Sequence, residues 1–365
     1  MSEERFMRRA LELAERGRYS VSPNPMVGCV IVRDGEIIGE GFHRRAGEPH
    51  AEIEAMRAAK GDVSGADFYV TLEPCAHYGR TPPCADALVA ARPARVIVAT
   101  GDPHENVAGR GIAALEEAGI HVEIGLLEDD AERQNERFLH TARTNSPFVL
   151  LKAGMTLDGK LATVDRSSQW ITSPESRERS LALREEFDAI LVGSGTVRTD
   201  DPQLSRRLGL NDGATPFTRV VLDGEGELPR DAGVLTDGSP TIVFTTDASL
   251  EPRSSAVEIV RLTASAGVFD LESIFSALWD RGIRSVIVEG GSLVHSSLIE
   301  KGQWQKMMLF IAPMIVGGGE APSIFGGSPI ARLTDAYRFR FDRIERLGPD
   351  LLLVAYPLSD SLHTS

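Results

Sequence analysis

Three residues whose side chains can bind a divalent metal stand in two short stretches of the chain. The stretch EPHAEIEAM carries His50 two residues before Glu52, and the stretch TLEPCAHYGRTPPCADAL carries Cys75 and Cys84. A catalytic zinc ion commonly takes three His or Cys ligands and keeps a fourth position for water, whose pKa then falls to about 7. His50, Cys75 and Cys84 can supply these ligands. Glu52 does not need to bind the metal, and it can carry protons between that water and a leaving amine.

The surroundings of the two cysteines suit this chemistry. Pro82 and Pro83 precede CADALVAA, which predicts a helix that begins near Cys84. A thiolate is favoured at a helix N-terminus, because the unpaired N–H groups there are partly positive. The arrangement resembles that of zinc deaminases, which carry His-x-Glu and Pro-Cys-x-x-Cys. Here eight residues separate the cysteines, so a loop with the turn-forming residues Gly79 and Pro82 must fold back to bring both sulfurs together.

Other interpretations of these residues are open. Cys75 and Cys84 could be ordinary buried thiols and His50 a histidine at a helix start, but their joint arrangement favours a metal site. A structural zinc would need a fourth protein ligand. Cys29, in the strand-like run VGCVIV, is predicted to be part of the core, and we assign His77 to substrate contact or loop packing.

Length and composition limit the class of protein. With 365 residues the chain should form two domains of about 150 residues or more. Its 42% hydrophobic and 25% charged residues are typical of a globular protein. The net charge of -14 argues against a general nucleic-acid binder, which needs a basic face. We see no export signal or membrane span, and three cysteines do not indicate a disulfide framework, so we predict a cytoplasmic protein.

The elements that must position these residues follow an α/β order. An amphipathic helix ends near Gly17, a hairpin turns at Asp34-Gly35, and a helix runs from about His50 to Lys60. Three strands that we expect to be buried on both faces then alternate with two helices, in the order FYVTL, CADALVAA, RVIVAT, GIAALEEAG and IHVEI. The pattern restarts after Ser146, where FVLLKAGMT begins a second α/β series. The predicted domains are therefore residues 1–146 and 147–365.

Two glycine-rich turns in the second part suit a dinucleotide. VIVEGGSLVHSSLIEKG predicts a strand, a glycine pair and a helix start that can hold a phosphate, and GSGTV follows the strand AILV. Neither matches G-x-G-x-x-G, so a standard Rossmann domain is disfavoured. The turn at residues 317–319 could approach a cofactor or form a plain loop.

Many runs of the chain resemble one family. In the first part these are SPNP, VGCVIV, GEGFHRRAGEPHAEIEA, YVTLEPCAHYGRTPPC and DPHENVAGRG, and in the second LDGKLAT, SQWIT, GSGTVRTDDPQLSRR and VEGG. Together they closely resemble the bifunctional deaminase-reductases of riboflavin biosynthesis over nearly the whole chain. That family also uses the eight-residue gap between the cysteines.

The resemblance implies both fold and reaction. It implies an α/β protein with an N-terminal cytidine-deaminase-like three-layer α/β/α domain and a C-terminal dihydrofolate-reductase-like α/β domain. The first would use one Zn²⁺, as zinc hydroxide, to deaminate 2,5-diamino-6-(5-phosphoribosylamino)pyrimidin-4-one. The second would use NADPH to reduce the ribosyl group, which gives 5-amino-6-(5-phosphoribitylamino)uracil.

The resemblance also implies roles for further residues. In the deaminase, Asn24 and His43 would hold the pyrimidine edge, and Arg80 is a candidate for the substrate phosphate. In the reductase, the NADPH contacts would be Gly154, Trp170, Thr172, Thr196, Asp200, Gly290 and Gly291, and the substrate contacts would be Ser168, Arg184, Arg207 and Glu289. Without the resemblance, two interpretations of Asn24, His43 and Arg80 stay equally open: these functional roles, or a turn residue, a surface histidine and a solvated arginine. Likewise Arg184 would lie on a solvated helix face, and Trp170 could be part of the core.

Two alternatives to the bifunctional enzyme remain. One is a zinc deaminase for another nucleobase whose C-terminal domain has lost reduction. The other is a zinc-stabilised RNA- or nucleotide-binding protein without activity, against which the acidic charge and the open fourth ligand position count. The expected partner is a small phosphorylated pyrimidine, without nucleic acid or membrane, and a homo-oligomer is left open.

Overall fold

The computed structural model describes residues 2–78, 82–104, 107–211, 213, 215–265 and 267–358. Contacts between Cα atoms divide the chain into two compact units. The first unit is Met1–Asn145 with Asn211–Thr215, and the second is Ser146–Leu210 with Pro216–Ser365. No helix within the described residues is long and apolar enough to cross a membrane.

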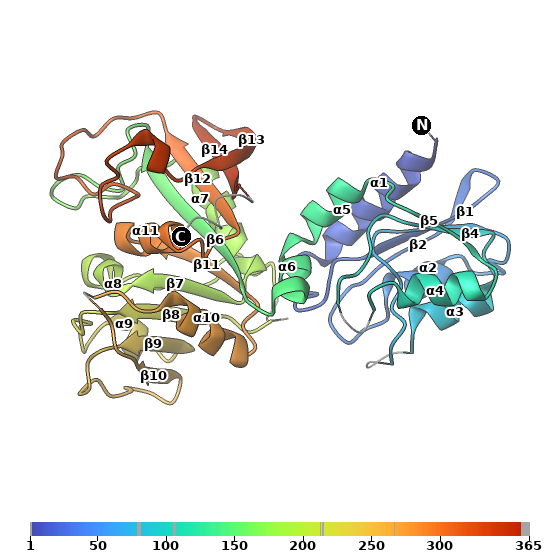
Figure 1. Cartoon of the computed structure of the whole chain (residues 1–365), viewed down its shortest axis with the longest axis horizontal. Helices are drawn as coiled ribbons and strands as arrows, with labels where there is room; N and C mark the ends of the chain where they lie inside the picture. The colour runs from blue at the N-terminus through green and yellow to red at the C-terminus, as the bar shows by residue number, and fades with distance from the viewer. Residues whose placement is uncertain are drawn as a thin grey trace. The chain divides into compact units, whose positions relative to one another are not determined.

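The first unit is a three-layer α/β/α sandwich, as expected (Figure 1). Its five-stranded sheet has the order β2-β1-β3-β4-β5, in which β1 is antiparallel to both neighbours and β3, β4 and β5 are parallel. The elements are α1 Ser2–Ala14, the 3₁₀ turn η1 Glu15–Gly17, β1 Gly28–Arg33, β2 Glu36–Phe42, α2 Ala51–Ala58, β3 Asp67–Val70, α3 Cys84–Ala91, β4 Arg95–Val98, α4 Arg110–Glu117, β5 His121–Ile124, α5 Glu128–Gln134 and α6 Glu136–Thr144.

Helices cover both faces of this sheet. Figure 1 shows α1 and α5 on one side and α2, α3 and α4 on the other. Ala51, Ala55, Leu88 and Leu115 of α2, α3 and α4 pack on one face, and Phe6, Met7, Ala10, Leu13 and Ala131 of α1 and α5 pack on the opposite face. At Gly41 a Cβ atom would overlap the backbone of α2 at Ala51 and Ala55. This close approach places the first turn of α2, which carries Glu52, against the sheet.

Two sequence predictions for this unit have different outcomes. The hairpin at Asp34-Gly35 is confirmed: both residues have positive φ, at 52° and 80°, and they join β1 to β2. The run His121–Ile124 was expected to be buried on both faces, and that is wrong. This strand, β5, lies at the sheet edge, where its two end residues are exposed and its two middle residues half-buried.

The second unit contains a nine-stranded sheet in the order β10-β9-β8-β7-β11-β6-β12-β14-β13. All neighbours are parallel except β12 with β14 and β14 with β13. The elements are β6 Phe148–Thr156, α7 Pro174–Glu186, β7 Ala189–Gly193, α8 Ser194–Asp200, β8 Thr218–Asp223, α9 Gly233–Thr236, β9 Thr241–Thr245, β10 Val257–Arg261, α10 Leu271–Asp280, β11 Ser285–Gly290, α11 Ser292–Glu300, β12 Lys306–Ala312, the 3₁₀ turn η2 Leu333–Asp335, β13 Phe339–Leu347 and β14 Asp350–Pro357.

Helices cover both faces of this sheet, and the carboxyl ends of its parallel strands are where a ligand site is expected. One buried cluster joins α10 and α11 to one sheet face, and a second joins α7, α8 and α9 to the other. Figure 1 shows β10 at one edge of the unit and β13 with β14 at the opposite edge. The carboxyl ends of the parallel strands β7 and β11 lead directly into α8 and α11. Ligands of open α/β sheets bind at such strand ends.

Candidate functional site

The structure brings His50, Cys75 and Cys84 together. His50 is the N-cap of α2, Cys84 is the first residue of α3 after the N-cap Pro83, and Cys75 lies in the segment after β3. The ligand atoms of the three residues lie within 4.8 Å of one another. His50 Nδ1 is 3.2 Å from Cys84 Sγ and 3.5 Å from Cys75 Sγ.

These donors fit a tetrahedral zinc ion. Zn–S bonds of about 2.3 Å and a Zn–N bond of about 2.0 Å give a tetrahedral N–S edge of about 3.5 Å, close to both observed distances. The Cys84 thiol, the His50 ring and the Cys84 backbone N–H all donate hydrogen bonds to Cys75 Sγ, and they lower the pKa of Cys75. The hydrogen bond to Cys75 raises the pKa of Cys84. A divalent cation bound here would take the place of the thiol protons, because cysteine binds a metal as the thiolate.

Cys29 and His77, which could have supplied a fourth protein ligand, do not belong to this group among the described residues. Cys29 is fully buried in the core of β1, as the sequence predicted. His77 is exposed, and its ring stacks on that of His104 with 6.4 Å between centroids.

Glu52 lies in the first turn of α2 beside the three donors. Its side chain is 3% exposed. Burial raises the pKa of Glu52, and a backbone hydrogen bond and the His50 charge offset part of that effect. A carboxyl group whose pKa is raised toward neutrality is suited to both accept and release a proton.

Asn24 and His43 lie next to the metal-binding candidates, because the ring of His43 contacts that of His50 and Asn24 contacts His43. His43 Nδ1 donates to the Pro49 carbonyl oxygen at 3.2 Å, which leaves Nε2 to accept from Asn24 Nδ2 at 3.0 Å. The His43 ring is 2% exposed and meets the His50 ring edge-on at 5.2 Å. Burial lowers the pKa of His43, which favours the neutral ring that this hydrogen-bond pattern requires. Arg80 lies outside the described residues.

Glu73 has a structural task that sequence reasoning missed. Its buried carboxylate accepts four backbone N–H groups, at 3.0 to 3.3 Å, from Asp102, Gly109, Gly111 and Ile112. At Gly111 a Cβ atom would overlap the Pro74 carbonyl oxygen. Glu73 therefore fixes the start of α4 against the segment that carries Cys75.

The second unit contains a cleft of ≈ 820 Å³ at the carboxyl ends of β7, β8 and β11. Of the residues predicted to bind cofactor or substrate, four line it: Ser168, Thr196, Asp200 and Gly291. Gly290 lies beside them, because a Cβ atom there would be 2.9 Å from Thr196 Oγ1. A cleft of this size can hold a dinucleotide, and Gly291 is the N-cap of α11, where a phosphate is favoured.

The other predicted cofactor residues, Gly154, Trp170 and Thr172, do not line this cleft. A Cβ atom at Gly154 would be 3.2 Å from Thr172 Cγ2, so β6 lies close to the segment before α7. Trp170 is 67% exposed, and the Arg177 guanidinium lies 4.5 Å from the centroid of its ring. The alternative that Trp170 is part of the core is therefore wrong. The turn at residues 317–319 leaves open space around its glycines.

Arg184 and Glu289 form a buried ion pair. Arg184 Nε and Nη2 donate to the two carboxylate oxygens of Glu289 at 2.7 and 2.8 Å, and Lys152 Nζ approaches Glu289 at 3.4 Å. The alternative that Arg184 lies on a solvated helix face is wrong, since its side chain is 12% exposed. Burial raises the pKa of Glu289, but the charges of Lys152 and Arg184 outweigh it and lower the pKa to about 2. Sequence reasoning missed Lys152, whose signal was a charged residue inside the apolar strand FVLLKAGMT.

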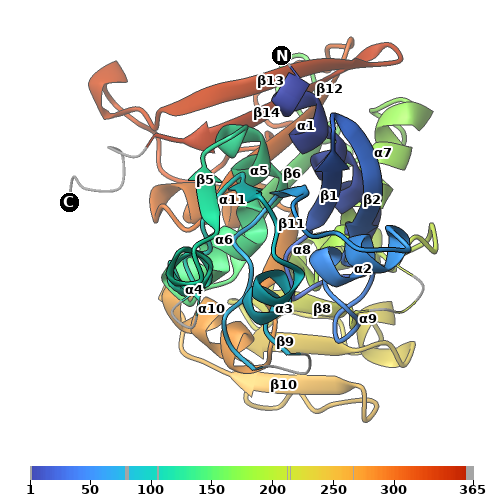
Figure 2. The same cartoon turned by 90° about the vertical axis from the view of Figure 1, so that its right-hand side faces the viewer.

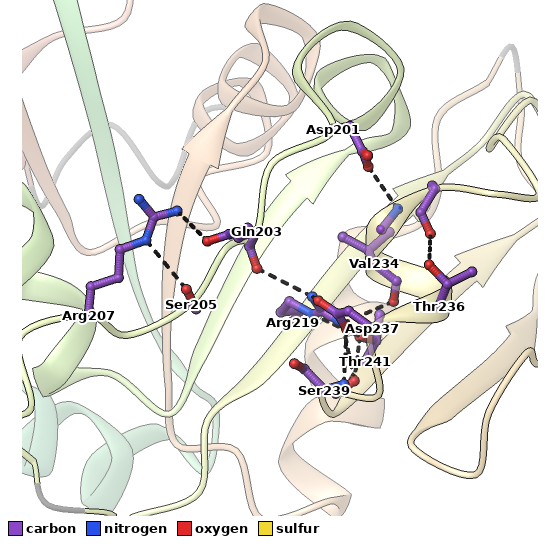
Figure 3. Close-up of polar contacts among 12 residues, drawn as sticks. Asp201, Gln203, Ser205, Arg207, Arg219, Val234, Thr236, Asp237, Ser239 and Thr241 are labelled. Carbon is purple, nitrogen blue, oxygen red and sulfur yellow. Dashed lines mark hydrogen bonds and ion pairs between the residues drawn. The ribbon is translucent and has the colours of Figure 1, made fainter.

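Arg207 is held in a different way. Figure 3 shows its guanidinium donating to the side chains of Gln203, at 3.2 Å, and Ser205, at 3.5 Å. The Gln203 carbonyl oxygen in turn accepts from the buried Arg219 at 3.3 Å. Arg219 is 2% exposed and is bound by both carboxylate oxygens of Asp237 at 2.6 Å. The exposed Arg207 is thus linked through the uncharged Gln203 to the buried pair of Arg219 and Asp237.

Comparison with known proteins gives matches over both units. Residues 147–353 match the RibD C-terminal domain, and residues 1–100 match the cytidine and deoxycytidylate deaminase zinc-binding region. The riboflavin biosynthesis protein RibD of Bacillus amyloliquefaciens is 43% identical over 359 residues, covering 97% of this chain and 96% of that protein. The RibD of Escherichia coli (strain K12) is 40% identical over 363 residues, covering 97% and 99%.

Solved structures agree with these matches. Acinetobacter baumannii RibD, form 1, superposes with a TM-score of 0.87 at 38% identity and covers 98% of this chain and 99% of its own. The diaminohydroxyphosphoribosylaminopyrimidine deaminase/5-amino-6-(5-phosphoribosylamino)uracil reductase of Thermotoga maritima gives 0.86 at 37%, with the same coverage. The expected fold class of both parts is confirmed.

Proposed function

The chain belongs to the RibD family of bifunctional deaminase-reductases of riboflavin biosynthesis, and from that premise we propose which residues perform each reaction. We assign the deaminase to residues 1–146 and the reductase to residues 147–365. The observation that carries the deaminase assignment is the approach of His50 Nδ1 to both cysteine sulfurs. We propose that His50, Cys75 and Cys84 hold one Zn²⁺.

Deamination requires proton movement as well as a metal. When bound, zinc lowers the pKa of a coordinated water to about 7 and so supplies the nucleophile. Glu52, buried and beside the metal donors, takes the proton of the attacking water and delivers it to the amine that leaves C2. His43 holds Asn24 in a fixed orientation, and Asn24 can then hydrogen-bond the pyrimidine edge. Arg80 stays a prediction for the substrate phosphate.

Reduction requires a hydride and a proton. When bound, NADPH supplies the hydride, and we place it in the cleft lined by Thr196, Asp200 and Gly291. The remaining predicted contacts, Gly154, Trp170, Thr172 and Gly290 for the cofactor and Ser168, Arg184, Arg207 and Glu289 for the substrate, stay part of this proposal. Within the cluster around Glu289, Lys152 is the cation that can release a proton, because arginine does not deprotonate in proteins.

The substrate is a small phosphorylated pyrimidine. We further propose a cytoplasmic enzyme without nucleic-acid or membrane partners, and the net charge of -14 supports this.

One experiment tests both reactions. The purified chain is incubated with 2,5-diamino-6-(5-phosphoribosylamino)pyrimidin-4-one, with and without NADPH, and the products are identified by mass. We expect ammonia release in both cases and the ribityl product only with NADPH. Ammonia release from another nucleobase in preference to this substrate, with no NADPH oxidation, would instead support the single-activity deaminase.

A further inference from the structure

Arg219 is a buried arginine of the second unit that neither proposed reaction uses. It is the second residue of β8, and its side chain is 2% exposed. Burying an arginine is costly unless its charge is paired and its N–H groups are hydrogen-bonded. The partners of Arg219 therefore indicate what its burial achieves.

Arg219 donates hydrogen bonds through all three of its guanidinium nitrogens. Nη1 and Nη2 donate to the two carboxylate oxygens of Asp237 at 2.6 Å, and Nε and Nη2 donate to Thr241 Oγ1 at 3.0 and 2.8 Å. Nη2 also lies 3.1 and 3.2 Å from the carbonyl oxygens of Val234 and Ser239. These acceptors belong to α9, to β9 and to the turn between them, and Figure 2 shows α9 beside β8 and β9. Arg219 thus joins these three elements.

Two contacts tie this group to the segment that carries Arg207. Arg219 Nη1 donates to the Gln203 carbonyl oxygen at 3.3 Å (Figure 3). The Gly233 N–H, at the start of α9, donates to Asp201 Oδ1 at 2.8 Å. Residues 201–203, directly after α8, are therefore fixed to α9 and β8.

The backbone of this segment needs such contacts. Asp201 and Leu204 have positive φ, at 36° and 51°. A side-chain-bearing residue in this conformation costs about 1–3 kcal/mol and persists only where the surrounding structure holds it. The Leu204 side chain is 3% exposed and belongs to the core cluster of α7, α8 and α9. The contacts that fix residues 201–204 therefore set the course of the chain toward Arg207.

Helix α7 holds the other end of the segment. Glu185 accepts from the backbone N–H groups of Arg207 and Leu208, at 3.2 and 2.9 Å. Between the two ends, the Arg207 guanidinium contacts the side chains of Gln203 and Ser205. A site whose supporting backbone is fixed in this way loses little entropy when a ligand binds.

We propose that Arg219 and Asp237 are positioning residues of the reductase. They fix the backbone at Gln203 and thereby hold Arg207 where it binds the phosphate of the substrate. This inference rests on the proposed role of Arg207. The phosphate is remote from the reacting carbon, so its contacts are equal in the ground state and the transition state. Their loss raises KM and leaves kcat unchanged.

The first test is Asp237→Ala, because this side chain is 38% exposed and its removal leaves the buried Arg219 in place. Without the carboxylate, Arg219 loses the partner that orients it toward the Gln203 carbonyl oxygen. The KM for the phosphorylated substrate should rise roughly tenfold, the equivalent of one hydrogen bond to a charged group. The kcat and the KM for NADPH should stay unchanged. Arg219→Lys keeps the charge but not the planar fork, and it should have the same effect.

The matched control is Glu258→Ala. Glu258 of β10 also binds an arginine, Arg281, through both carboxylate oxygens, and its side chain is 50% exposed. It does not line the cleft of the second unit. This variant should leave both KM values and kcat unchanged.

A double variant separates positioning from a direct contact with the substrate. Arg207→Ala alone should raise the KM for the phosphorylated substrate by roughly 10–100-fold. Adding Asp237→Ala should raise it no further, because Asp237 acts through Arg207.

The outcomes distinguish this inference from the function on which it rests. If Arg207→Ala leaves the KM unchanged, the proposed role of Arg207 fails, and the positioning role fails with it. If Arg207→Ala raises the KM but Asp237→Ala and Arg219→Lys do not, only the positioning role is overturned. Additive effects in the double variant would also overturn it. The same holds for a fall in kcat with both KM values raised, which marks a general structural role.

Discussion

Replacing Glu289 by glutamine tests whether the buried ion pair stabilises the second unit. The carboxylate is 8% exposed and lies between Arg184, at 2.7 Å, and Lys152, at 3.4 Å. Glutamine keeps the shape of the side chain but removes the charge. Arg184 and Lys152 then stay buried near each other without a counter-charge, which is the costly form of a broken ion pair.

The magnitude follows from the pKa of Glu289. The pKa falls from 4.5 to about 2 in the folded chain, and each unit corresponds to about 1.36 kcal/mol, so the charged form contributes on the order of 3 kcal/mol. Because the folded pKa is depressed, this stabilisation is present above pH 4.5 and is lost as the pH falls toward 2. For a unit of this size, a loss of about 3 kcal/mol lowers Tm by about 10 °C.

The assay is differential scanning calorimetry of the full chain at pH 7 and pH 4. The control is Glu251→Gln. Glu251 pairs with Arg261, and its side chain is 74% exposed. Breaking this exposed ion pair should change the free energy of unfolding by less than about 1 kcal/mol. Glu289→Gln should lower the Tm of the second unit at pH 7, and the difference from the parent should be smaller at pH 4. Adding Lys152→Met should recover part of the loss. Equal Tm values for the Glu289 and Glu251 variants at pH 7 would refute the reasoning.

Three further predictions concern the two sites. Glu52→Gln should slow deamination by roughly 10²–10⁴-fold with an unchanged zinc content by mass spectrometry; loss of zinc would contradict a purely proton-carrying role. Arg207→Ala should raise the reductase KM for the phosphorylated substrate and leave ammonia release intact. The control Arg230→Ala, which removes an exposed arginine that binds Asp247 in the same unit, should change neither the KM nor ammonia release. If Arg207→Ala damages both activities equally, the two reactions do not use separate sites. Gly111→Ala should lower stability by about 1–3 kcal/mol and weaken zinc retention, because its Cβ overlaps the Pro74 carbonyl, while Gly101→Ala, with no neighbour closer than 3.8 Å, should be silent.

The cluster of His50, Cys75 and Cys84 could be predicted because each residue stands in a recognisable local sequence. Pro83 ends an extended segment and Cys84 starts a helix, while His50 and Glu52 share one turn. A metal-binding residue at a helix start can be recognised from a few neighbouring residues, and this recognition does not depend on contacts between distant parts of the chain. The supporting role of Glu73 was not predictable in this way, since its four backbone donors lie 29 to 39 residues away.

The reductase cluster shows the limit of sequence reasoning more clearly. Arg184 and Glu289 are 105 residues apart, and the helix ESRERSLALREE has too many charges for one to be recognised as buried. The edge position of β5 was missed for a related reason. The apolar content of a strand predicts that it is a strand, but its neighbours in the sheet decide how deeply it is buried.

The contacts of Arg184 and Arg207 indicate different roles for these two residues, although the sequence predicted the same role for both. Both were predicted to bind the ribosyl phosphate substrate, and both can donate a planar fork to a phosphate. The fork of Arg184 is already taken by Glu289, and its remaining Nη1 donates to the Ser205 carbonyl oxygen at 3.2 Å. Arg207 donates through its guanidinium to the neutral Gln203 and Ser205, at distances of 3.2 and 3.5 Å, which a phosphate can displace at small cost. We therefore expect Arg207 to bind the phosphate and Arg184 to act on the substrate indirectly, by holding Glu289 ionised.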